Sequence, residues 1–431
     1  MRRLPPILQP LREPAFRLLW TGMSTSLIGD GAFMVALAWA AYSLKNAPTA
    51  LSIVGVAMTL PQVLFLLVGG VVSDRFDRRR VLIASDGARA AVLAAVAALA
   101  LSGRLTLGLI VALVCFYSVA TAFFGPAFDA FVPDLVPGDL LPQANALDQL
   151  VRPIAARLVG PALGGALIAV GGTSAAFTLD AATFVIAAGC AALISPSHLA
   201  RTPTPGTEPS SFFADCRGGV RFIRRHVWLW GTFLGATFAY LLFVGPSEVL
   251  LPYVVKNELH ASASVLGAVL AVGGLGGVVA AFAMSQRPFP RRHMTFIYVT
   301  WTIATLAIAG YGIATSAWQL MAAALVFNGL EAAGTIVWAT TKQRLVPADY
   351  LGRVSSLDWF ISIGLLPLSY ALTGPIAAAL GSRQTLVGAG VIGAVVTGAF
   401  LFLPGMRDLE PLQENALPTP TGRLGLAPTD A

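Results

Sequence analysis

Charged residues are scarce in this sequence, and the motifs of several enzyme classes are missing from it. Only 11% of the 431 residues are Asp, Glu, Lys or Arg, whereas soluble globular chains contain roughly a quarter. No Gly-x-x-x-x-Gly-Lys-Ser/Thr phosphate loop occurs, so ATP is not expected to be the direct energy source. The four histidines fall in expected loops or at helix ends, and the three cysteines show no framework spacing. The sequence therefore excludes an ordinary soluble domain, and we expect neither enzyme activity nor a cofactor or metal.

Hydrophobic residues make up 56% of the chain and recur in long runs. A helix needs about 20 mainly apolar residues to cross the ~30 Å hydrocarbon core of a bilayer. Twelve such runs predict an all-α integral membrane protein with twelve transmembrane helices. They lie near residues 17–44, 50–73, 81–101, 105–128, 148–170, 173–195, 227–254, 262–285, 294–313, 318–341, 355–378 and 384–404.

The positive charges predict how these helices are oriented. If the N-terminus is cytoplasmic, only Lys45, Arg104, Lys256 and Arg383 fall on the outer side, and the other 24 of the 28 Lys and Arg fall on the cytoplasmic side. This asymmetry follows the positive-inside rule. We therefore expect a multi-pass protein of the cell membrane, embedded in the lipid bilayer with both termini cytoplasmic. The net charge of +7 is then an orientation signal, and no nucleic-acid partner is expected.

A Pro- and Thr-rich stretch divides the chain into two related parts. Residues 135–150 align without gaps with residues 345–360, and seven of the sixteen positions are identical. This repeat predicts two pseudo-symmetric six-helix bundles, over residues 1–195 and 227–404. We expect a cytoplasmic linker over 196–226 that contains an amphipathic helix starting at Ser211 and lying on the inner leaflet. The tail, 405–431, is expected to be disordered and cytoplasmic.

The loop between the second and third predicted helices carries the most specific pattern. It reads Gly70-x-x-x-Asp74-Arg75-x-x-Arg78-Arg79. This spacing resembles motif A of the major facilitator superfamily of transporters. The resemblance implies a gate in which Asp74 caps the eleventh helix and Arg75 or Arg78 reaches Asp129. Asp77 stands where the family usually has Gly, and we expect it to adopt the left-handed backbone of a tight turn.

The fifth predicted helix carries a second pattern, Gly160-Pro161-x-x-Gly164-Gly165. Small residues let another helix approach closely, and Pro161 bends the helix, although ordinary close packing would also account for such a run. The pattern is similar to the end of motif C of proton-coupled antiporters. Gly125-Pro126-Ala127 and Gly352-Arg353-Val354 resemble the branch that contains enterobactin exporters and macrolide-efflux-type proteins.

The resemblance implies a major facilitator fold and a function in secondary active transport. The expected activity is proton-coupled efflux of an amphipathic small molecule, such as a drug, a siderophore or a natural product, by alternating access. We expect a monomer whose partners are its substrate and protons. An importer or uniporter of the same fold remains an alternative, as does a non-transporting membrane receptor or scaffold.

Ionisable residues inside predicted helices are the candidates for coupling. Asp30 lies near the middle of the first helix, where a carboxylate costs at least ~2.5 kcal/mol on insertion scales. It either carries a proton or is permanently paired. Arg157 is its candidate counter-charge, although this arginine can equally extend to the inner interface. Glu331 is a second candidate for substrate or proton binding, whereas Asp180 is expected to be structural and Glu248 to lie on the outer rim.

Several side chains are candidates to line a substrate cavity, although most such aromatic residues face lipid or pack in a core. These candidates are Phe33, Phe65, Phe116, Phe124, Phe243, Asn328 and Trp338.

The predicted topology can be tested by labelling single cysteines in a version of the protein without its native cysteines. Asn46→Cys and Asn257→Cys should react with a membrane-impermeant maleimide added outside the cell, because both lie in predicted outer loops. Pro205→Cys should react only when the reagent reaches the cytoplasmic side. Labelling of Pro205→Cys from outside would overturn the predicted topology.

Overall fold

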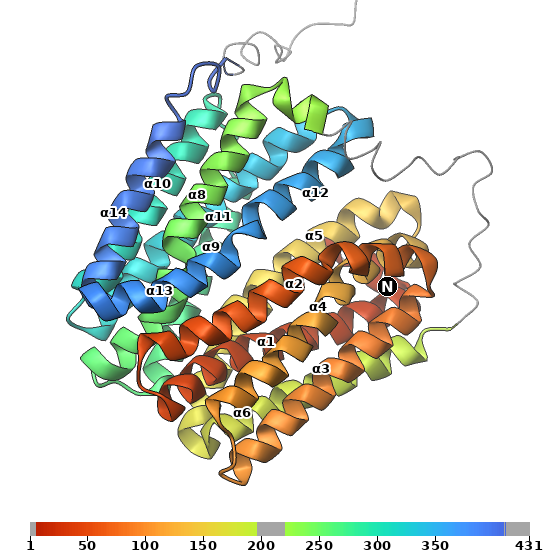
Figure 1. The fold of residues 1–431 in the computed structure, drawn as a ribbon. Coiled ribbons are helices and arrows are strands. Elements are labelled where there is room, and N and C mark those ends of the chain that lie inside the picture. The colour runs from red at the N-terminus through yellow and green to blue at the C-terminus, as the bar shows by residue number, and fades with distance from the viewer. Residues whose placement is uncertain (1–5, 196–219, 409, 411–431) are drawn as a thin grey trace, which may run out of the picture.

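Long helices make up nearly all of the described chain, and no strand occurs in the ranges described (Figure 1). The structure is a computed structural model that describes residues 6–195, 220–408 and 410. The long helices are α1 (Pro14–Leu44), α2 (Pro48–Arg75), α3 (Arg78–Leu101), α4 (Leu107–Leu135), α6 (Gly160–Leu193), α8 (Val227–Tyr253), α9 (Ala263–Ser285), α10 (His293–Ile313), α11 (Ala317–Leu345) and α14 (Ser382–Phe400). Shorter elements are η1 (Pro6–Arg12), η2 (Gly138–Leu140), α5 (Leu141–Arg152), η3 (Pro153–Val159), η5 (Val254–Glu258), α12 (Ala348–Gly364) and α13 (Leu366–Leu380).

Eleven helical segments of the described chain are long and apolar enough to cross a membrane, and one of them accounts for two crossings. This segment, Gln143–Leu193, has 51 residues, more than twice the number that a crossing needs. Gly172 interrupts it with a φ of 70°. Gly160 and Asp180 both pack against the same part of α1, so the chain reverses direction between them. The predicted all-α architecture with twelve crossings is confirmed.

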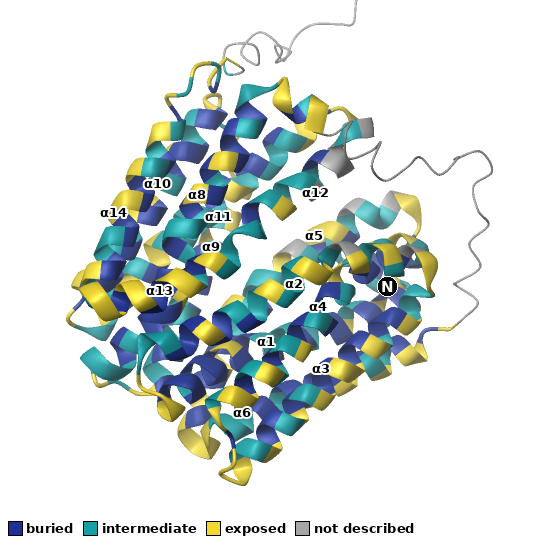
Figure 2. Ribbon diagram, in the orientation of Figure 1, coloured by how far each residue is buried: buried dark blue, intermediate teal, exposed yellow. Residues whose placement is uncertain are grey.

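The helices form two bundles (Figure 1). In the first bundle α6 packs on α1 and α3, and α4 packs on α2 and α3. In the second, α11 packs on α9 and α10, and α14 packs on α8 and α10. The bundles meet where α13 contacts α2 and where α6 contacts α9. One apolar cluster is shared by both bundles, and each bundle has a further cluster of its own; Figure 2 shows buried residues on the helix faces turned toward other helices.

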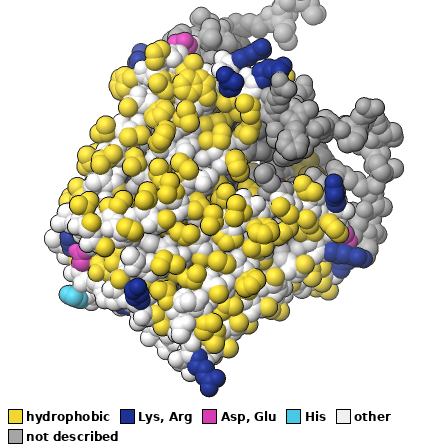
Figure 3. All heavy atoms as spheres, in the orientation of Figure 1, with side chains coloured by type: hydrophobic (Ala, Val, Ile, Leu, Met, Phe, Trp, Pro, Cys, Tyr) yellow, Lys and Arg dark blue, Asp and Glu magenta, His cyan; other side chains and the backbone are white. Residues whose placement is uncertain are grey.

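The outer surface of the protein is apolar. Large hydrophobic side chains such as Phe116, Phe282 and Val395 are two-thirds or more exposed. Figure 3 shows hydrophobic side chains across the visible face, with most of its Lys and Arg near the two ends. A patch of this size on a soluble protein would promote aggregation. Such an apolar surface suits a lipid bilayer, because the hydrocarbon core of the bilayer offers no hydrogen-bond partners to exposed polar groups.

The described side-chain hydrogen bonds between the two bundles lie toward one end of the structure, which we call the closed end. There Tyr42 donates to the carbonyl of Val249 at 2.5 Å, and Asn46 donates to Asn257 at 2.6 Å. Within the described residues, every side-chain hydrogen bond between the bundles lies in the half of the molecule toward this end. At the opposite end the ribbons of α5 and α12 lie apart (Figure 1).

Two of the predicted helices are interrupted at related positions. The fifth contains η3, a stretch of π-helix that begins at Pro153, and the eleventh breaks at Leu365 between α12 and α13. Pro367 near the start of α13 lacks the N–H that would continue the helix. The offset of 210 residues that relates the sequence repeats also brings 153–159 onto 363–369. The duplication therefore extends to irregular backbone.

The linker and the tail lie largely outside the described residues. The amphipathic helix expected from Ser211 is described only from Val220 onward. There Ile223 is buried in the second bundle, and Phe222 stacks on Tyr350 with ring centroids 4.9 Å apart. This last turn therefore docks on protein.

Of the tail expected over 405–431, the structure describes 405–408 and 410. There Met406 is buried in the second bundle and Glu410 accepts a hydrogen bond from the N–H of Thr295 at 2.7 Å, so the start of this segment is packed. The residues from 411 lie outside the described chain.

The turn at Gly172 gives a test of the fold. Gly172→Ala should lower the thermal unfolding midpoint of the purified protein, because at φ 70° and ψ −176° the backbone is in a region essentially restricted to glycine, where another residue costs about 1–3 kcal/mol. Gly189→Ala is the matched control, since a methyl group there meets open space on a regular helix. Equal midpoints for the two variants would show that the chain does not turn at Gly172.

Candidate functional site

Asp30 lies inside the first bundle and is hydrogen-bonded to another helix. The Tyr117 hydroxyl of α4 donates to Asp30 Oδ1 at 2.5 Å. Phe33, almost one turn along α1, packs on Tyr117 and on Phe177, with ring centroids 5.1 Å and 6.1 Å apart. Phe33 therefore holds the tyrosine in place and lines none of the cavities described here. In the described chain no Lys or Arg forms an ion pair with Asp30, so its polar partner is a neutral donor.

A buried ion pair on α3 lies close to Asp30. Arg89 donates to Asp86, and the side chains of both residues are 3% exposed. The Arg89 guanidinium is sandwiched between the rings of Phe124 and Phe184, 4.4 Å and 4.2 Å from their centroids. These contacts keep the charge away from lipid, because Asp86 neutralises it and aromatic faces attract a cation.

Sequence reasoning missed this ion pair. Arg89 had been counted among the cytoplasmic positive charges, and its burial inside the bundle corrects that assignment. A signal was available, because Asp86 and Arg89 stand three residues apart inside an apolar run, a spacing that brings side chains together on a helix.

Asp180 also belongs to this group. It is fully buried on α6, and its Oδ1 accepts a hydrogen bond from Thr183 at 3.2 Å, while Oδ2 has no partner. It packs directly on Gly29 of α1, where even a methyl group would overlap Asp180 and Thr183. The residue next to Gly29 is Asp30. The structure thus brings Asp180, a predicted structural residue, beside the predicted coupling residue.

Together these side chains form what we call the buried charge cluster, which consists of Asp30, Asp86, Arg89, Tyr117 and Asp180. Three carboxyl groups in it interact electrostatically with one guanidinium. Arg157 is not a member. This arginine is exposed on η3, and its charge acts on Glu248 and Tyr240 of α8. The cations that act on Asp30 are therefore Arg89 and, more weakly, Arg152, and the expected pairing with Arg157 is not present among the described contacts.

The motif A loop begins α3 with a helix cap. The Asp77 side chain accepts hydrogen bonds from the backbone N–H of Arg79 at 3.0 Å and of Arg80 at 3.4 Å. Its φ is −58°, so the expectation of a left-handed backbone at Asp77 is wrong. Asp is favoured here because a carboxylate satisfies free N–H groups at a helix start.

The motif A arginines connect helices of the first bundle. Arg78 pairs with Asp134 at 2.6 Å and donates to the carbonyl of Ala130 at 2.9 Å. The expected partner Asp129 is therefore wrong, and Asp134 lies five residues further along α4. Arg79 donates to the carbonyls of Ala191 and Ala192 at the end of α6, where a cation is favoured by the helix dipole.

The remaining motif A residues contribute less to the described contacts. Arg75 is exposed, and a methyl group on Gly70 would meet open space. The side chain of Asp74 lies outside the described part of the structure, so its cap on the eleventh helix stays a prediction.

The motif C residues lie at the seam between the bundles. Gly160 packs against the backbone of Ile28 and Gly31, and Gly164 packs against Ala32. Gly165 faces α9 in the other bundle, where a methyl group would come within 3.1 Å of the Cα atoms of Gly267 and Ser264. Pro161 Cδ in turn faces Gly31, and the Pro161 carbonyl faces Gly267. These small residues let α6 contact α1 and α9 at backbone distance.

A cavity between the bundles, the interbundle cavity, is lined by side chains of both. Its walls enclose about 810 Å³ of space, including a part open to solvent. Met34 of α1 and Met58 of α2 line it from the first bundle, and Glu248, Asn328 and Tyr370 line it from the second. Of the seven side chains predicted to line a substrate cavity, Asn328 is the one that lines this interbundle cavity. Glu248 lies in this cavity and not on the outer rim.

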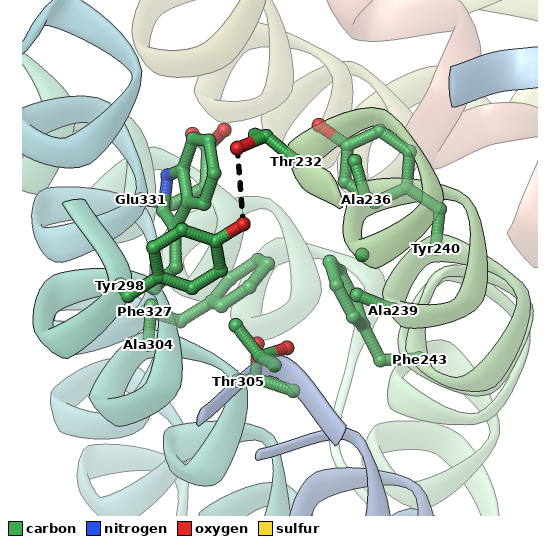
Figure 4. Close-up of a pocket in the computed structure, with 13 residues that line it drawn as sticks. Thr232, Ala236, Ala239, Tyr240, Phe243, Tyr298, Ala304, Thr305, Phe327 and Glu331 are labelled. Carbon is green, nitrogen blue, oxygen red and sulfur yellow. Dashed lines mark hydrogen bonds between the residues drawn. The ribbon is translucent and has the colours of Figure 1, made fainter. Parts of the chain in front are cut away.

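A second pocket lies inside the second bundle and is lined by two of the predicted site residues, Phe243 and Glu331. Figure 4 shows side chains of α8, among them Tyr240 and Phe243, across from Tyr298 of α10 and from Glu331 of α11. The space between them is about 460 Å³. Glu331 accepts a hydrogen bond from Thr335 at 3.0 Å. Phe327 lines this pocket and the interbundle cavity alike.

The other aromatic candidates lie elsewhere. Phe65 and Phe116 are 39% and 68% exposed. Phe124 packs on Arg89, as described above. Trp338 donates to Asp358 at 3.1 Å and is buried in the second bundle. None of these four lines a cavity described here.

The internal repeat places similar ion pairs in the two bundles. Asp148 pairs with Arg152 at 2.7 Å, which confirms a pairing that their spacing predicts, and Arg152 lies 5.7 Å from the ring of Phe128. In the second bundle Asp358 pairs with Lys342, which lies 5.3 Å from the ring of Trp338. The same offset of 210 relates the two aspartates and the two aromatic residues. Each bundle thus holds a carboxylate and an aromatic ring at equivalent positions, whereas the cation comes from different places, Arg152 of α5 and Lys342 of α11.

Two bundles of six crossings, with a cavity between them and charges buried inside one, are the architecture of a major facilitator superfamily transporter. The chain belongs to the transmembrane secretion effector family of this superfamily, whose family model matches residues 6–428. It is therefore a membrane transporter and not an enzyme.

Relatives along nearly the whole length include efflux proteins. The multidrug efflux pump Tap of Mycolicibacterium fortuitum is 27% identical, over 93% of this chain and 98% of that protein. Macrolide efflux protein A of Streptococcus pyogenes is 24% identical, over 88% of this chain and 93% of that protein.

Solved transporter structures have the same fold. A bacterial homologue of the human lysosomal transporter Spinster, in an inward-facing and unoccupied conformation, has a TM-score of 0.67 at 16% identity and covers 93% of this chain. The nucleoside transporter NupG, as its D323A mutant, also has a TM-score of 0.67, at 12% identity.

The ion pair of α3 can be tested by a double-mutant cycle. Arg89→Gln should destabilise the protein by about 3–5 kcal/mol, because it leaves the Asp86 carboxylate buried without a counter-charge. Adding Asp86→Asn should recover part of this loss, since the second change removes the unpaired charge. Thermal unfolding midpoints in detergent measure both effects. If the double variant lost as much stability as the two single variants combined, Asp86 and Arg89 would not interact, and the described pair would be contradicted.

Proposed function

We propose that this protein is a proton-coupled exporter of amphipathic small molecules that works by alternating access, with Asp30 carrying the coupled proton. The observation that supports this most is the position of α1. Asp30 belongs to the buried charge cluster, and Met34, one turn along the same helix, lines the interbundle cavity. A change of charge at Asp30 therefore acts on a helix that also contacts the substrate space.

The composition of the buried charge cluster suits a proton carrier. The cluster contains one guanidinium and three carboxyl groups, so when fully ionised it would have a net negative charge inside an apolar bundle; Arg152, outside the cluster, also acts on Asp30, but more weakly than Arg89. Such a charge is costly, and protons can remove it. Asp86 already pairs with Arg89, whereas Asp30 has only the Tyr117 hydroxyl. Among the described contacts, Asp30 and Asp180 each have only a neutral hydroxyl as their direct partner, and of these two Asp30 is the one on the helix that also lines the interbundle cavity.

The arrangement of the bundles supports alternating access. Hydrogen bonds join the bundles only toward the closed end, as far as the chain is described. Under the predicted topology this is the extracytoplasmic end, so the cavity of this conformation faces the cytoplasm. The similar Spinster homologue is described as inward-facing. When the closed end opens and the opposite end closes, the cavity would face the outside and release the substrate there.

Export is favoured over import by the relatives and by motif C. Both curated relatives described above are named as efflux proteins. Of the motif C glycines, Gly165 packs on α9 at the seam where the bundles would rock against each other, whereas Gly160 and Gly164 pack on α1. We infer that the exporter acts as a monomer with both termini in the cytoplasm.

Asp30→Asn tests the coupling, because it removes the charge and keeps the shape. In proteoliposomes, a macrolide such as erythromycin should still exchange down its own gradient. Accumulation driven by an imposed pH gradient should be lost, since the variant cannot carry the proton.

Asp77→Asn is the matched control. Asn caps a helix as well as Asp does, so this variant should retain accumulation against the gradient. Gradient-driven accumulation by Asp30→Asn with unchanged pH dependence would refute the role of Asp30. Absence of pH-driven accumulation by the wild-type protein, for a panel of macrolides and tetracyclines, would refute proton-coupled export.

A further inference from the structure

One carboxylate faces the interbundle cavity, and it is the only charged side chain among the described residues that line it. Glu248 lies on α8 and is exposed toward this space. Within the described chain its carboxylate forms no hydrogen bond and no ion pair, unlike Glu258 nearby, which pairs with Arg383. An acidic group left without a partner in an apolar cavity suits a ligand that brings the opposite charge.

The backbone fixes the position of this carboxylate. One turn before Glu248, the N–H of Gly245 donates to the Ser369 hydroxyl of α13 at 2.8 Å. A methyl group on Gly245 would overlap the backbone of Ser369, so α8 and α13 are in direct contact. Pro246 follows and leaves one helical carbonyl without its usual donor. Glu248 is therefore presented from a rigid junction and not from a flexible loop.

The walls around Glu248 suit an apolar cation of variable shape. Tyr311, Phe327 and Tyr370 line the same cavity, and aromatic faces attract cations. Met34 and Met58 line it from the first bundle, and the flexible thioether of Met adapts to different ligand surfaces. We propose that the interbundle cavity binds organic cations, with Glu248 as their counter-charge. This inference rests on the proposed transport function and names its substrate class.

Arg157 is the opposing charge across the seam. It is exposed on η3 of the first bundle and acts electrostatically on Glu248, but the two residues form no ion pair in the described structure. Its backbone carbonyl packs on Gly274 of α9, which fixes η3 against the second bundle. A cationic ligand at Glu248 competes with Arg157 for the same carboxylate. Loss of the arginine charge should therefore strengthen binding of a cation, and loss of Glu248 should weaken it.

Binding to the purified protein tests this without any ion gradient. The probes are tetraphenylphosphonium, an apolar cation, and triphenylphosphine oxide, a neutral compound with a similar apolar body. Glu248→Gln should weaken tetraphenylphosphonium binding about tenfold or more, which corresponds to ~1.4 kcal/mol. Glu248→Asp should retain most of the affinity because it keeps the charge. Arg157→Gln should increase the affinity several-fold. Binding of the neutral probe should change less than about twofold in all three variants.

Glu13→Gln is the control for net charge, since Glu13 precedes α1 and its side chain makes no capping hydrogen bond. It should leave tetraphenylphosphonium binding unchanged. Equal losses for both probes in Glu248→Gln would show a structural role and overturn the inference. So would a wild-type protein that does not bind tetraphenylphosphonium.

The same assay separates this inference from the proposed function. Glu248-dependent binding of the cation, without pH-driven accumulation in proteoliposomes, would support the site and refute proton-coupled export. Conversely, pH-driven export together with tetraphenylphosphonium binding that is unaffected by Glu248→Gln would support export and refute the site. If Glu248→Gln does not fold, the pair of Glu248→Asp and Arg157→Gln decides, because only a charge-based site predicts retained binding in one and increased binding in the other.

Discussion

The positive charge of Arg89 has to be kept away from lipid, and the first bundle is built around this requirement. α3 supplies the charge and its counter-ion Asp86, while α4 and α6 supply the rings of Phe124 and Phe184 that cover it. A buried ion pair contributes little net stability, because desolvation opposes the attraction between the charges. Here the ion pair matters because it fixes the position of Arg89. With Arg89 fixed, the carboxyl groups of α1 and α6 gather in one place, beside the helix that lines the interbundle cavity.

Most of the fold could be predicted because the bilayer imposes a simple rule of about 20 apolar residues per crossing. The rule also separates the fifth and sixth crossings, although there the chain turns at a single residue, Gly172. The repeat of residues 135–150 indicates the duplication, which the related ion pairs of Asp148 and Asp358 extend to side chains. The breaks at Pro153 and Leu365 were not predicted, because both lie inside apolar runs where hydropathy gives no signal.

The buried charge cluster could be predicted only in part, because its contacts depend on how each helix is rotated about its axis. Asp30 is conspicuous in the sequence as an isolated charge, but its partner depends on which faces of α3 and η3 point inward. Arg157 lies within reach of Asp30 by its position along the helix, but its charge acts on Glu248 and not on Asp30. Arg89, which does act on Asp30, was not predicted to lie near it. The choice of Asp134 over Asp129 has the same origin. Both acids lie near the end of α4, and only the rotation of the helix decides which one meets Arg78.

The closed end of the molecule consists almost entirely of helix ends. Its connections are residues 45–47, 102–106, 259–262 and 314–316, together with single glycines at 172 and 381. Connections this short leave hardly any loop for an antibody, a protease or a glycan to reach. If this end faces the environment of the cell, as the distribution of positive charges predicts, the transporter presents almost no peptide surface to it. A blocking ligand would then have to enter the cavity itself.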